Sequence, residues 1–322
     1  MTRPKVILTR RWPAEVETEL ARRYEVELNA TDAPLDAAAL RAALARADAL
    51  CPTVTDAITA EVLATPARRA RMLGNFGVGY NHVDIDAARR AGVLVTNTPG
   101  VLTECTADLA MTLLLMVARR AGEGEREVRA GAWSGWRPTH LLGTRVTGKT
   151  LGLVGFGRIA QAVARKAHFG FGMRVLFHTR TPPPAAVVNA LGASARPLDE
   201  LLAEADFVSL HCPGGAATHH LLDAGRLAAM RPDAFLVNTA RGDVVDQDAL
   251  IAALAARRIA GAGLDVYAGE PRVPPALLAL DNVVLLPHLG SASRETRVAM
   301  GMRVLENLDA FFAGREPPDR VA

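Results

Sequence analysis

Short apolar runs recur along the chain and alternate with segments whose apolar residues are spaced as in a helix. In the first hundred residues the runs lie at 6–8, 49–51, 72–73 and 93–95, with an alternating strand pattern at 24–28 and helical patterns at 13–22, 35–45, 58–63 and 86–91 between them. Strands that alternate with helices over short connections form parallel β-α-β units. The pattern therefore predicts an α/β domain in this part of the chain.

A second series of the same kind begins at Thr150. Its apolar runs lie at 151–154, 174–177, 207–210, 235–237, 259–264 and 283–286, and six strands make a complete dinucleotide-binding sheet. A long helix precedes the series at 103–120, apolar nearly all round, and another follows at 291–312, capped by Ser291 or Ser293 and ended by Gly314. We predict an α/β protein of two Rossmann-like domains with parallel sheets. Residues 1–99 with 291–322 would form a flavodoxin-like substrate domain, and residues 100–290 an NAD(P)-binding domain.

A glycine-rich turn follows the first strand of the second series. Gly155 and Gly157 stand between that strand and a helical pattern, and Ala160 occupies the third small position. In this context the first glycine permits a tight turn, and the second lets N–H groups approach a pyrophosphate at the helix N-terminus. The alternative is an ordinary glycine turn before a helix, but the flanking elements favour a cofactor loop.

The second strand of this series ends in a basic segment rather than an acidic one. An Asp or Glu about 20 residues past the glycine turn would bind the ribose 2′-hydroxyl of NAD, yet no acid occurs between Gly157 and Asp199. The strand end carries Thr179, Arg180 and Thr181 instead. Because an arginine can pair with a 2′-phosphate and hydroxyls can hydrogen-bond to it, we predict NADP(H) in preference to NAD(H). The alternative is a solvated surface arginine.

Three polar residues, Arg241, Glu270 and His288, come after the last three apolar runs. The carboxyl ends of parallel strands meet at one edge of a sheet, where a nicotinamide would lie. Reduction of a 2-keto acid leaves an alkoxide, to which His288 can deliver a proton while Glu270 orients the imidazole. Arg241 would bind the substrate carboxylate or polarise its carbonyl, and Asp265 would orient the carboxamide or neighbouring groups. Singly, the three have ordinary alternatives as a surface arginine, a loop glutamate and a helix-capping histidine.

Two further loops carry candidate contacts. The segment 74–81 is rich in glycine and lies at the end of a predicted strand. Its N–H groups would hold a carboxylate, and the alternative is that the segment is a plain turn. The segment 130–138 holds Trp133 and Trp136, whose indoles would be buried against another subunit or a ligand. For Trp133, packing on the chain's own core is the favoured alternative.

Composition narrows the classes of partner. The 322 residues carry a net charge of +3, and the 37 Lys and Arg residues are dispersed among acids, so no nucleic-acid-binding face is predicted. Three widely spaced cysteines without a C-x-x-C pattern indicate a reducing compartment, and no metal site is predicted. The N-terminus has no signal-peptide pattern and the longest apolar run is too short to span a bilayer. We therefore expect a soluble cytoplasmic protein without a membrane partner.

Together these motifs resemble the D-isomer-specific 2-hydroxyacid dehydrogenases over essentially the full length of the chain. The resemblance rests on Gly155-Phe-Gly157-Arg158-Ile159, Asn238-Thr-Ala-Arg241-Gly242, Gly263-Leu-Asp265-Val, Glu270-Pro271 and Pro287-His288-Leu-Gly290-Ser291. Within the family the chain is most similar to the glyoxylate/hydroxypyruvate reductases. That finer match rests on Thr96-Asn-Thr-Pro-Gly-Val-Leu-Thr103, Trp133-Ser-Gly-Trp136-Arg-Pro138 and the basic segment 179–181.

The resemblance implies roles that the patterns alone do not give. The three strand-end residues named above would be the catalytic set, with His288 the proton donor in reduction. Val78 and Gly79 would hold the substrate carboxylate through their backbone, and Trp136 would reach into the partner's active site in a homodimer. The implied cofactor contacts are Arg158, Ile159, Pro213, Thr239, Asp265 and Gly290, with Thr103 near the nicotinamide.

The function that the resemblance implies is NADPH-preferring reduction of glyoxylate and hydroxypyruvate to glycolate and D-glycerate, in a cleft between the domains. The alternatives are another D-2-hydroxyacid or phosphonate dehydrogenase, and a corepressor-like protein in which cofactor binding gates partner recognition. The lack of long flanking tails disfavours the last. Two departures from the family pattern are Ala160, which should be tolerated, and Gly214-Gly215 after Pro213, which puts the adenosine contacts in question.

Overall fold

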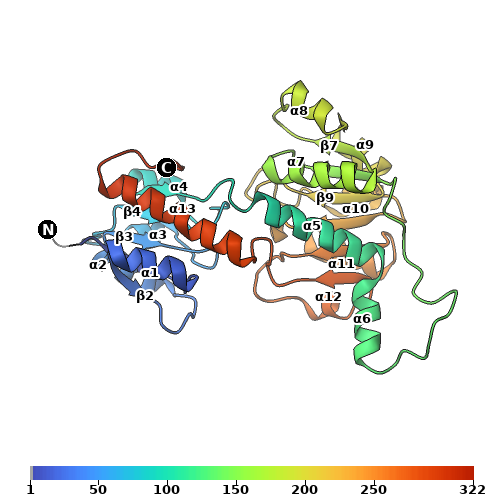
Figure 1. Cartoon of the computed structure of the whole chain (residues 1–322), viewed down its shortest axis with the longest axis horizontal. Helices are drawn as coiled ribbons and strands as arrows, with labels where there is room; N and C mark the ends of the chain where they lie inside the picture. Colours follow the sequence, from blue (N-terminus) through green and yellow to red (C-terminus); the bar gives the residue numbers. More distant parts are fainter. Residues whose placement is uncertain (1–2) are drawn as a thin grey trace. The chain divides into compact units, whose positions relative to one another are not determined.

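The computed structural model describes residues 3–322 and divides into two compact units (Figure 1). The first unit comprises Met1–Leu102 and Ser291–Ala322, and the second comprises Thr103–Gly290. The N-terminal segment, in which no signal peptide is predicted, begins with Met1 and Thr2, and these two residues lie outside the described residues. Because the end of the chain returns to the first unit, the second unit is an insertion within the first.

The first unit is built on a five-stranded parallel sheet. Its strands are β1 (Lys5–Leu8), β2 (Glu25–Leu28), β3 (Ala49–Cys51), β4 (Met72–Gly74) and β5 (Leu94–Thr96). They lie in the order β2-β1-β3-β4-β5, which is the flavodoxin-like order. The predicted α/β fold is confirmed for this unit.

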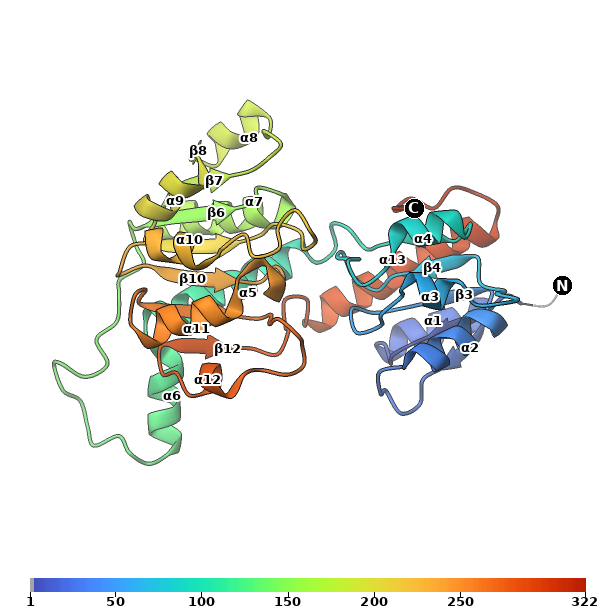
Figure 2. The ribbon, with the colours of Figure 1, turned by 180° about the vertical axis from the view of Figure 1, so that it is seen from behind.

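Helices cover both faces of this sheet (Figures 1 and 2). Helix α1 (Ala14–Arg23) lies beside α13 (Arg294–Phe312) on one face, and α2 (Ala37–Arg46), α3 (Ala60–Leu63) and α4 (Ile85–Arg90) lie on the other. Of the two predicted caps of α13, Ser293 is the one used, since its Oγ accepts a hydrogen bond from the Thr296 N–H at 3.2 Å. Val304 and Leu308 of this helix are fully buried, so the end of the chain completes the core of the first unit.

The second unit is built on a seven-stranded parallel sheet. Its strands are β6 (Thr150–Val154), β7 (Arg174–His178), β8 (Ala193–Ala195), β9 (Phe207–Leu210), β10 (Phe235–Asn238), β11 (Gly261–Leu264) and β12 (Val283–Leu285). They lie in the order β12-β11-β10-β9-β6-β7-β8. The first three strands therefore extend from β6 to one side of the sheet, and β9 to β12 extend to the other side. The carboxyl ends of β6 and β9 therefore meet at the kind of switch point where open α/β sheets bind dinucleotides.

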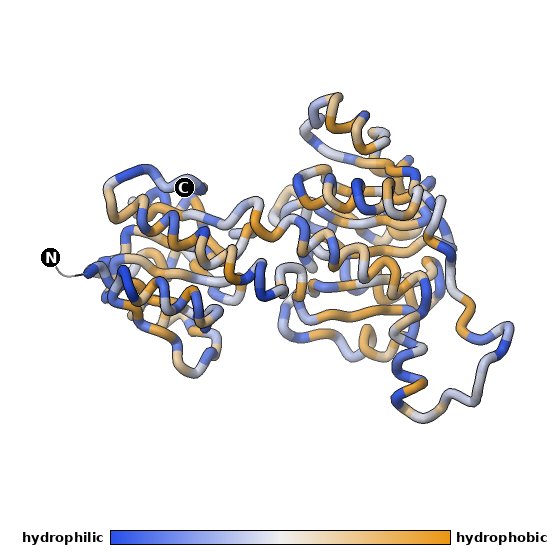
Figure 3. The backbone as a smooth tube through the Cα atoms, viewed as in Figure 1, coloured by the Kyte–Doolittle hydropathy of each residue, from blue (hydrophilic) through white to orange (hydrophobic). Residues whose placement is uncertain are grey.

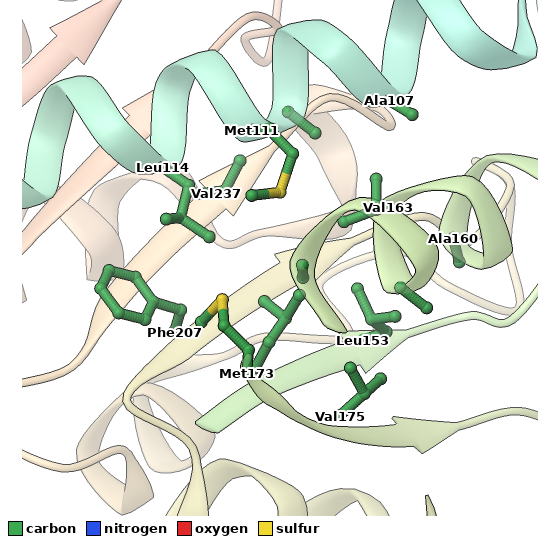
Figure 4. Packing of buried hydrophobic residues seen from close by; sticks show 14 of the residues in the cluster. Ala107, Met111, Leu114, Leu153, Ala160, Val163, Met173, Val175, Phe207 and Val237 are labelled. Atoms are coloured by element: carbon green, nitrogen blue, oxygen red, sulfur yellow. The ribbon is translucent and has the colours of Figure 1, made fainter. Parts of the chain in front are cut away.

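Two apolar clusters hold helices against the two faces of this sheet. One cluster joins α5 (Thr103–Ala118) and α7 (Arg158–Arg165), where Met111, Leu114 and Val163 lie over Leu153 and its neighbours (Figure 4). The other joins α9 (Leu198–Glu204), α10 (Ala224–Ala229) and α11 (Gln247–Ala255) to the opposite face. The remaining elements are α6 (Ala121–Arg129), a π-helical turn (Lys166–Gly170), α8 (Ala185–Ala190), a 3-10 turn (Gly242–Val244) and α12 (Pro275–Leu278).

The structure differs from the predicted pattern at two elements. The sheet has a seventh strand, β8, which pairs with β7 at the edge and has only Ala193 buried, so it lacks an apolar run. Helix α6 was not predicted, and it buries none of its residues and is mostly hydrophilic (Figure 3). Within residues 3–322, no helix has both the length and the apolar character needed to cross a membrane.

Candidate active site

The glycine turn lies where the sheet of the second unit changes direction. Gly155 follows β6 with a φ of +90°, and its N–H donates to the carbonyl of His178 at 2.8 Å. A Cβ at this position would lie 2.8 Å from the carbonyl carbon of His211 and from the Cys212 nitrogen. Both the left-handed backbone and the close approach of β9's end therefore require glycine here.

The N-terminus of α7 beside this turn is open. Gly157 is the N-cap of the helix, no side chain caps it, and a Cβ there would meet no atom within 4 Å. Unpaired N–H groups in the first helical turn attract an anion, and the helix dipole adds to this attraction. Ala160 is fully buried against the sheet, which explains the need for a small third residue. The turn thus fits a dinucleotide pyrophosphate, with Arg158 and Ile159 as the first residues of the helix.

The basic segment after β7 is accessible. Arg180 is exposed, and no carboxylate in the described part of the chain lies within ion-pairing distance of it. The neighbouring Thr179 hydroxyl donates to the carbonyl of Thr181 at 3.3 Å, which shapes the turn. An unpaired guanidinium with no acid beside it suits a phosphate better than a ribose hydroxyl.

Arg241 stands at the end of β10 on a turn that Asn238 folds. The Asn238 side chain is buried, accepts from the Ala240 N–H at 3.0 Å and donates to the Arg241 carbonyl at 2.9 Å. The Arg241 Nη1 donates to the Ala240 carbonyl at 2.6 Å. Burial lowers the pKa of Arg241, and the charges of Glu270 and Asp243 oppose that shift.

His288 and Glu270 form a hydrogen-bonded pair. The imidazole Nδ1 lies 2.8 Å from Glu270 Oε2, so Nδ1 carries the hydrogen and Nε2 is the nitrogen left for a substrate. Both side chains are about one-third exposed. Burial acts to raise the pKa of Glu270, but the hydrogen bond and charge of His288, the Tyr267 N–H and the charge of Arg241 together hold it below its usual range. Glu270 is therefore an anion that accepts the Nδ1 hydrogen of His288.

Asp265 holds the backbone around His288. Its two carboxylate oxygens accept from the N–H groups of Leu289 at 2.6 Å and Gly290 at 2.8 Å, and its own carbonyl accepts from the His288 N–H at 2.9 Å. His288 has a φ of +56°, a left-handed conformation that is strained for a residue with a Cβ. These three bonds stabilise that conformation. Burial, the largest influence, raises the pKa of Asp265, although the Leu289 and Gly290 N–H groups oppose it.

The other predicted cofactor contacts lie around the same edge of the sheet. Thr239 directly follows β10, and its Oγ1 is buried without a hydrogen-bond partner among the described residues. A buried hydroxyl without a partner is costly, which fits a site completed by a bound group. Pro213 follows β9, Thr103 begins α5, and Gly290 accepts from Thr106 Oγ1 at 2.8 Å.

The predicted substrate loop belongs to the first unit, where Val78 and Gly79 follow β4. The carbonyl of Val78 accepts from the Asn97 side chain at 2.8 Å, and that of Gly79 accepts from the Asn75 side chain at 3.1 Å. The N–H groups of Val78 and Gly79 have no acceptor within residues 3–322. The loop is thus fixed through its carbonyls while its N–H groups stay available for an anion.

The two tryptophans after α6 are exposed. Trp133 is 54% exposed and Trp136 is 80% exposed, in a segment without regular structure that follows α6 (Figures 1 and 2). The favoured reading of Trp133 as a residue of the chain's own core is therefore wrong. Both indoles are accessible, and their contact with another subunit or a ligand stays a prediction.

The second unit brings together the predicted catalytic residues and the predicted cofactor contacts. Sequence reasoning missed residues that fix this site, among them Asn238 and Tyr267. Both lie inside motifs already noted, Asn238 before Arg241 and Tyr267 between Asp265 and Glu270. The sequence signal that could have found them is that each is a polar side chain within a motif at the end of a strand.

Comparisons with known proteins identify the family of the chain. Residues 111–290 match the family model of the D-isomer specific 2-hydroxyacid dehydrogenase, NAD binding domain. The chain is 46% identical to a glyoxylate reductase of Thermococcus onnurineus, over 99% of this chain and 96% of that protein. Its structure is similar to that of the TT0316 protein from Thermus thermophilus, with a TM-score of 0.90, 48% identity and coverage of 99% and 100%. It is also similar to an NADPH-dependent glyoxylate/hydroxypyruvate reductase from Sinorhizobium meliloti in complex with NADP and malonate, with a TM-score of 0.88, 37% identity and coverage of 100% and 97%.

Proposed function

Because the chain belongs to the D-isomer-specific 2-hydroxyacid dehydrogenases, we propose that it reduces glyoxylate and hydroxypyruvate to glycolate and D-glycerate with NADPH. The protein is an NAD(P)-dependent oxidoreductase. The observation that carries the proposal is the His288–Glu270 pair beside Arg241, at the sheet edge that also holds the open glycine turn. The names of the relatives from T. onnurineus and S. meliloti support the choice of substrate.

The side chains of this site can supply what keto reduction needs. The bound nicotinamide would supply a hydride to the carbonyl carbon of the substrate. Arg241 would bind the substrate carboxylate or polarise its carbonyl through a charge-assisted contact, and its own desolvation strengthens that contact. His288 would donate its Nε2 proton to the carbonyl oxygen, so that hydride and proton together convert the carbonyl group to an alcohol. Glu270 keeps Nδ1 bonded and stabilises the imidazolium before the proton is transferred.

The preference for NADPH rests on the basic segment after β7. Arg180 is exposed and has no acidic partner in the described chain, and Thr179 and Thr181 offer hydroxyls beside it. These groups would hold the 2′-phosphate, while the N-terminus of α7 would hold the pyrophosphate. Thr239, with its unpaired hydroxyl, would complete the cofactor site.

The proposal includes a substrate contact from the first unit and a second subunit. The N–H groups of Val78 and Gly79 would hold the carboxylate of the 2-keto acid, since they have no acceptor in residues 3–322. The exposed Trp133 and Trp136 would be covered in a homodimer, with Trp136 near the partner's substrate.

Steady-state kinetics with glyoxylate, hydroxypyruvate and pyruvate, each with NADPH and with NADH, test the proposal. We expect the highest kcat/KM for glyoxylate or hydroxypyruvate with NADPH. A clear preference for pyruvate would contradict the substrate assignment, and a clear preference for NADH would contradict the cofactor assignment. If the protein bound NADPH but turned over none of these keto acids, the result would favour the corepressor-like alternative.

A further inference from the structure

Tyr267 lies close to the three proposed catalytic residues, but it is not itself proposed to act on the substrate. It stands three residues past the end of β11, in the loop that leads to Glu270, and it is 8% exposed. Its hydroxyl, its N–H and its carbonyl each face a different part of the site. Its position therefore joins segments that are far apart in the sequence.

The hydroxyl of Tyr267 holds the segment that leads to His288. The β11–β12 pairing ends at Leu264 and Leu285, and the Leu286 N–H still donates to the Leu264 carbonyl at 2.8 Å. Tyr267 Oη then donates to the Leu286 carbonyl at 2.9 Å, and it lies 3.3 Å from the Leu264 carbonyl. The hydroxyl thus extends the ladder past the last pair of strand residues, two residues before His288.

The backbone N–H of Tyr267 holds Glu270. It donates to Glu270 Oε1 at 3.0 Å, while Oε2 of the same carboxylate accepts from His288. One residue therefore fixes both partners of the His288–Glu270 pair, the carboxylate through its N–H and the histidine segment through its hydroxyl.

The carbonyl side of Tyr267 packs against the turn that carries Arg241. A Cβ at Gly242 would overlap the carbonyl group of Tyr267 and the nitrogen of Ala268, so the two backbone segments are in direct contact. Glycine at this position is what allows the approach. Tyr267 thus bonds to Glu270 directly, to Leu286 two residues before His288, and touches Gly242, the residue after Arg241.

We propose that Tyr267 is a positioning residue that sets the geometry of Arg241, Glu270 and His288, an inference that rests on the proposed function. Its phenol is a hydrogen-bond donor at neutral pH, because burial and the charges of Asp265 and Glu270 raise its pKa to about 12. It therefore acts through the backbone carbonyl of Leu286 and does not exchange a proton with the substrate.

The test is the Tyr267→Phe variant, which removes one oxygen atom and keeps the ring. We expect kcat for glyoxylate to fall roughly three- to tenfold, the effect of one ordinary hydrogen bond, while the Kd for NADPH is unchanged. With the segment that carries His288 less well held against Glu270, the alkaline limb of the kcat profile should also move to lower pH. These readouts follow from positioning, and a residue that only stabilised the fold would leave them unchanged.

Tyr24→Phe is the matched control. Tyr24 is 5% exposed and its hydroxyl donates to Asp309 Oδ1 at 2.6 Å in the first unit, so this variant also loses one buried phenol bond. Both variants should lower the Tm, but only Tyr267→Phe should change kcat and the pH profile.

Four outcomes decide the matter. A Tyr267→Phe enzyme with a lower Tm but the kcat and pH profile of the wild type would overturn the proposal, as would a variant that no longer folds or binds NADPH, since either result indicates a purely structural role. Wild-type protein that binds NADPH but turns over no keto acid would instead refute the proposed function itself. A fall in kcat with unchanged NADPH binding supports the inference.

Discussion

Replacing Glu270 with glutamine removes one negative charge from the proposed catalytic pair and keeps the size and shape of the side chain. Both oxygens of the carboxylate accept from N–H donors, Tyr267 N at 3.0 Å and His288 Nδ1 at 2.8 Å. A glutamine has only one oxygen, so one of these two donors must face an amide NH₂ group. The variant therefore loses one charge-assisted hydrogen bond and the anion that favours a protonated imidazole.

The expected loss follows from these contacts. A hydrogen bond to a charged group contributes about 1.5–3 kcal/mol, which corresponds to ~10–100-fold in kcat/KM for glyoxylate. The pH dependence changes as well. The pKa of Glu270 lies below its usual range because burial is outweighed by His288, Tyr267 and Arg241, so the wild-type group is an anion throughout the neutral range. Without that anion the protonated imidazole is less favoured, and keto reduction should decline at lower pH than in the wild type.

The assay is the rate of NADPH oxidation measured from mildly acidic to mildly alkaline pH. Glu17→Gln is the control, because Glu17 is 8% exposed and its two oxygens also accept from N–H groups, those of Trp12 and Arg11. This control should lose stability and keep the wild-type pH profile. If Glu270→Gln kept both the wild-type kcat/KM and the wild-type alkaline limb, Glu270 would have no part in proton transfer.

Other substitutions test separate parts of the site. His288→Ala should lower kcat by about 10²–10⁴-fold, because the proton donor is lost, while NADPH titrations give an unchanged Kd; near-normal turnover would refute His288 as the acid. Arg180→Asp should reverse the NADPH preference, raising KM for NADPH by ~10–100-fold with little effect on NADH, and an unchanged ratio of the two would show that another group reads the phosphate. Gly155→Ala should lower both Tm and NADPH affinity, since its Cβ would lie 2.8 Å from backbone atoms of His211 and Cys212 at a φ of +90°; normal cofactor binding would mean that the turn relaxes at little cost.

The elements that the sequence predicted well are those with a buried face. β3 and β9 are buried at every position, and an apolar run between turn residues was enough to locate them. β8 has one buried residue and α6 has none, so neither has an apolar pattern that could be recognised. β8 is specified by its backbone pairing with β7, which hydrophobic periodicity does not reveal.

The candidate site was predictable as a list of residues but not as a geometry. Strand ends placed Arg241, Glu270 and His288 at one sheet edge, because parallel strands present their carboxyl ends together. The left-handed conformation of His288 and its support by Asp265 depend on contacts across the sheet, which no local pattern contains. The indole of Trp133 could not be assigned to core or surface from sequence for the same reason.

The return of α13 to the first unit has a consequence for the order in which the chain is made. A ribosome produces β1 to β5 first, but Val304 and Leu308, which lie fully buried in that unit, are added only after the whole second unit. During synthesis the second unit should therefore finish folding while the first unit still lacks α13. This is contrary to the usual order, in which the N-terminal domain folds first. A chain truncated after Gly290 and released from the ribosome would show this as protease resistance confined to Thr103–Gly290, and equal resistance in the N-terminal hundred residues would argue that the first sheet can hold its shape without its last helix.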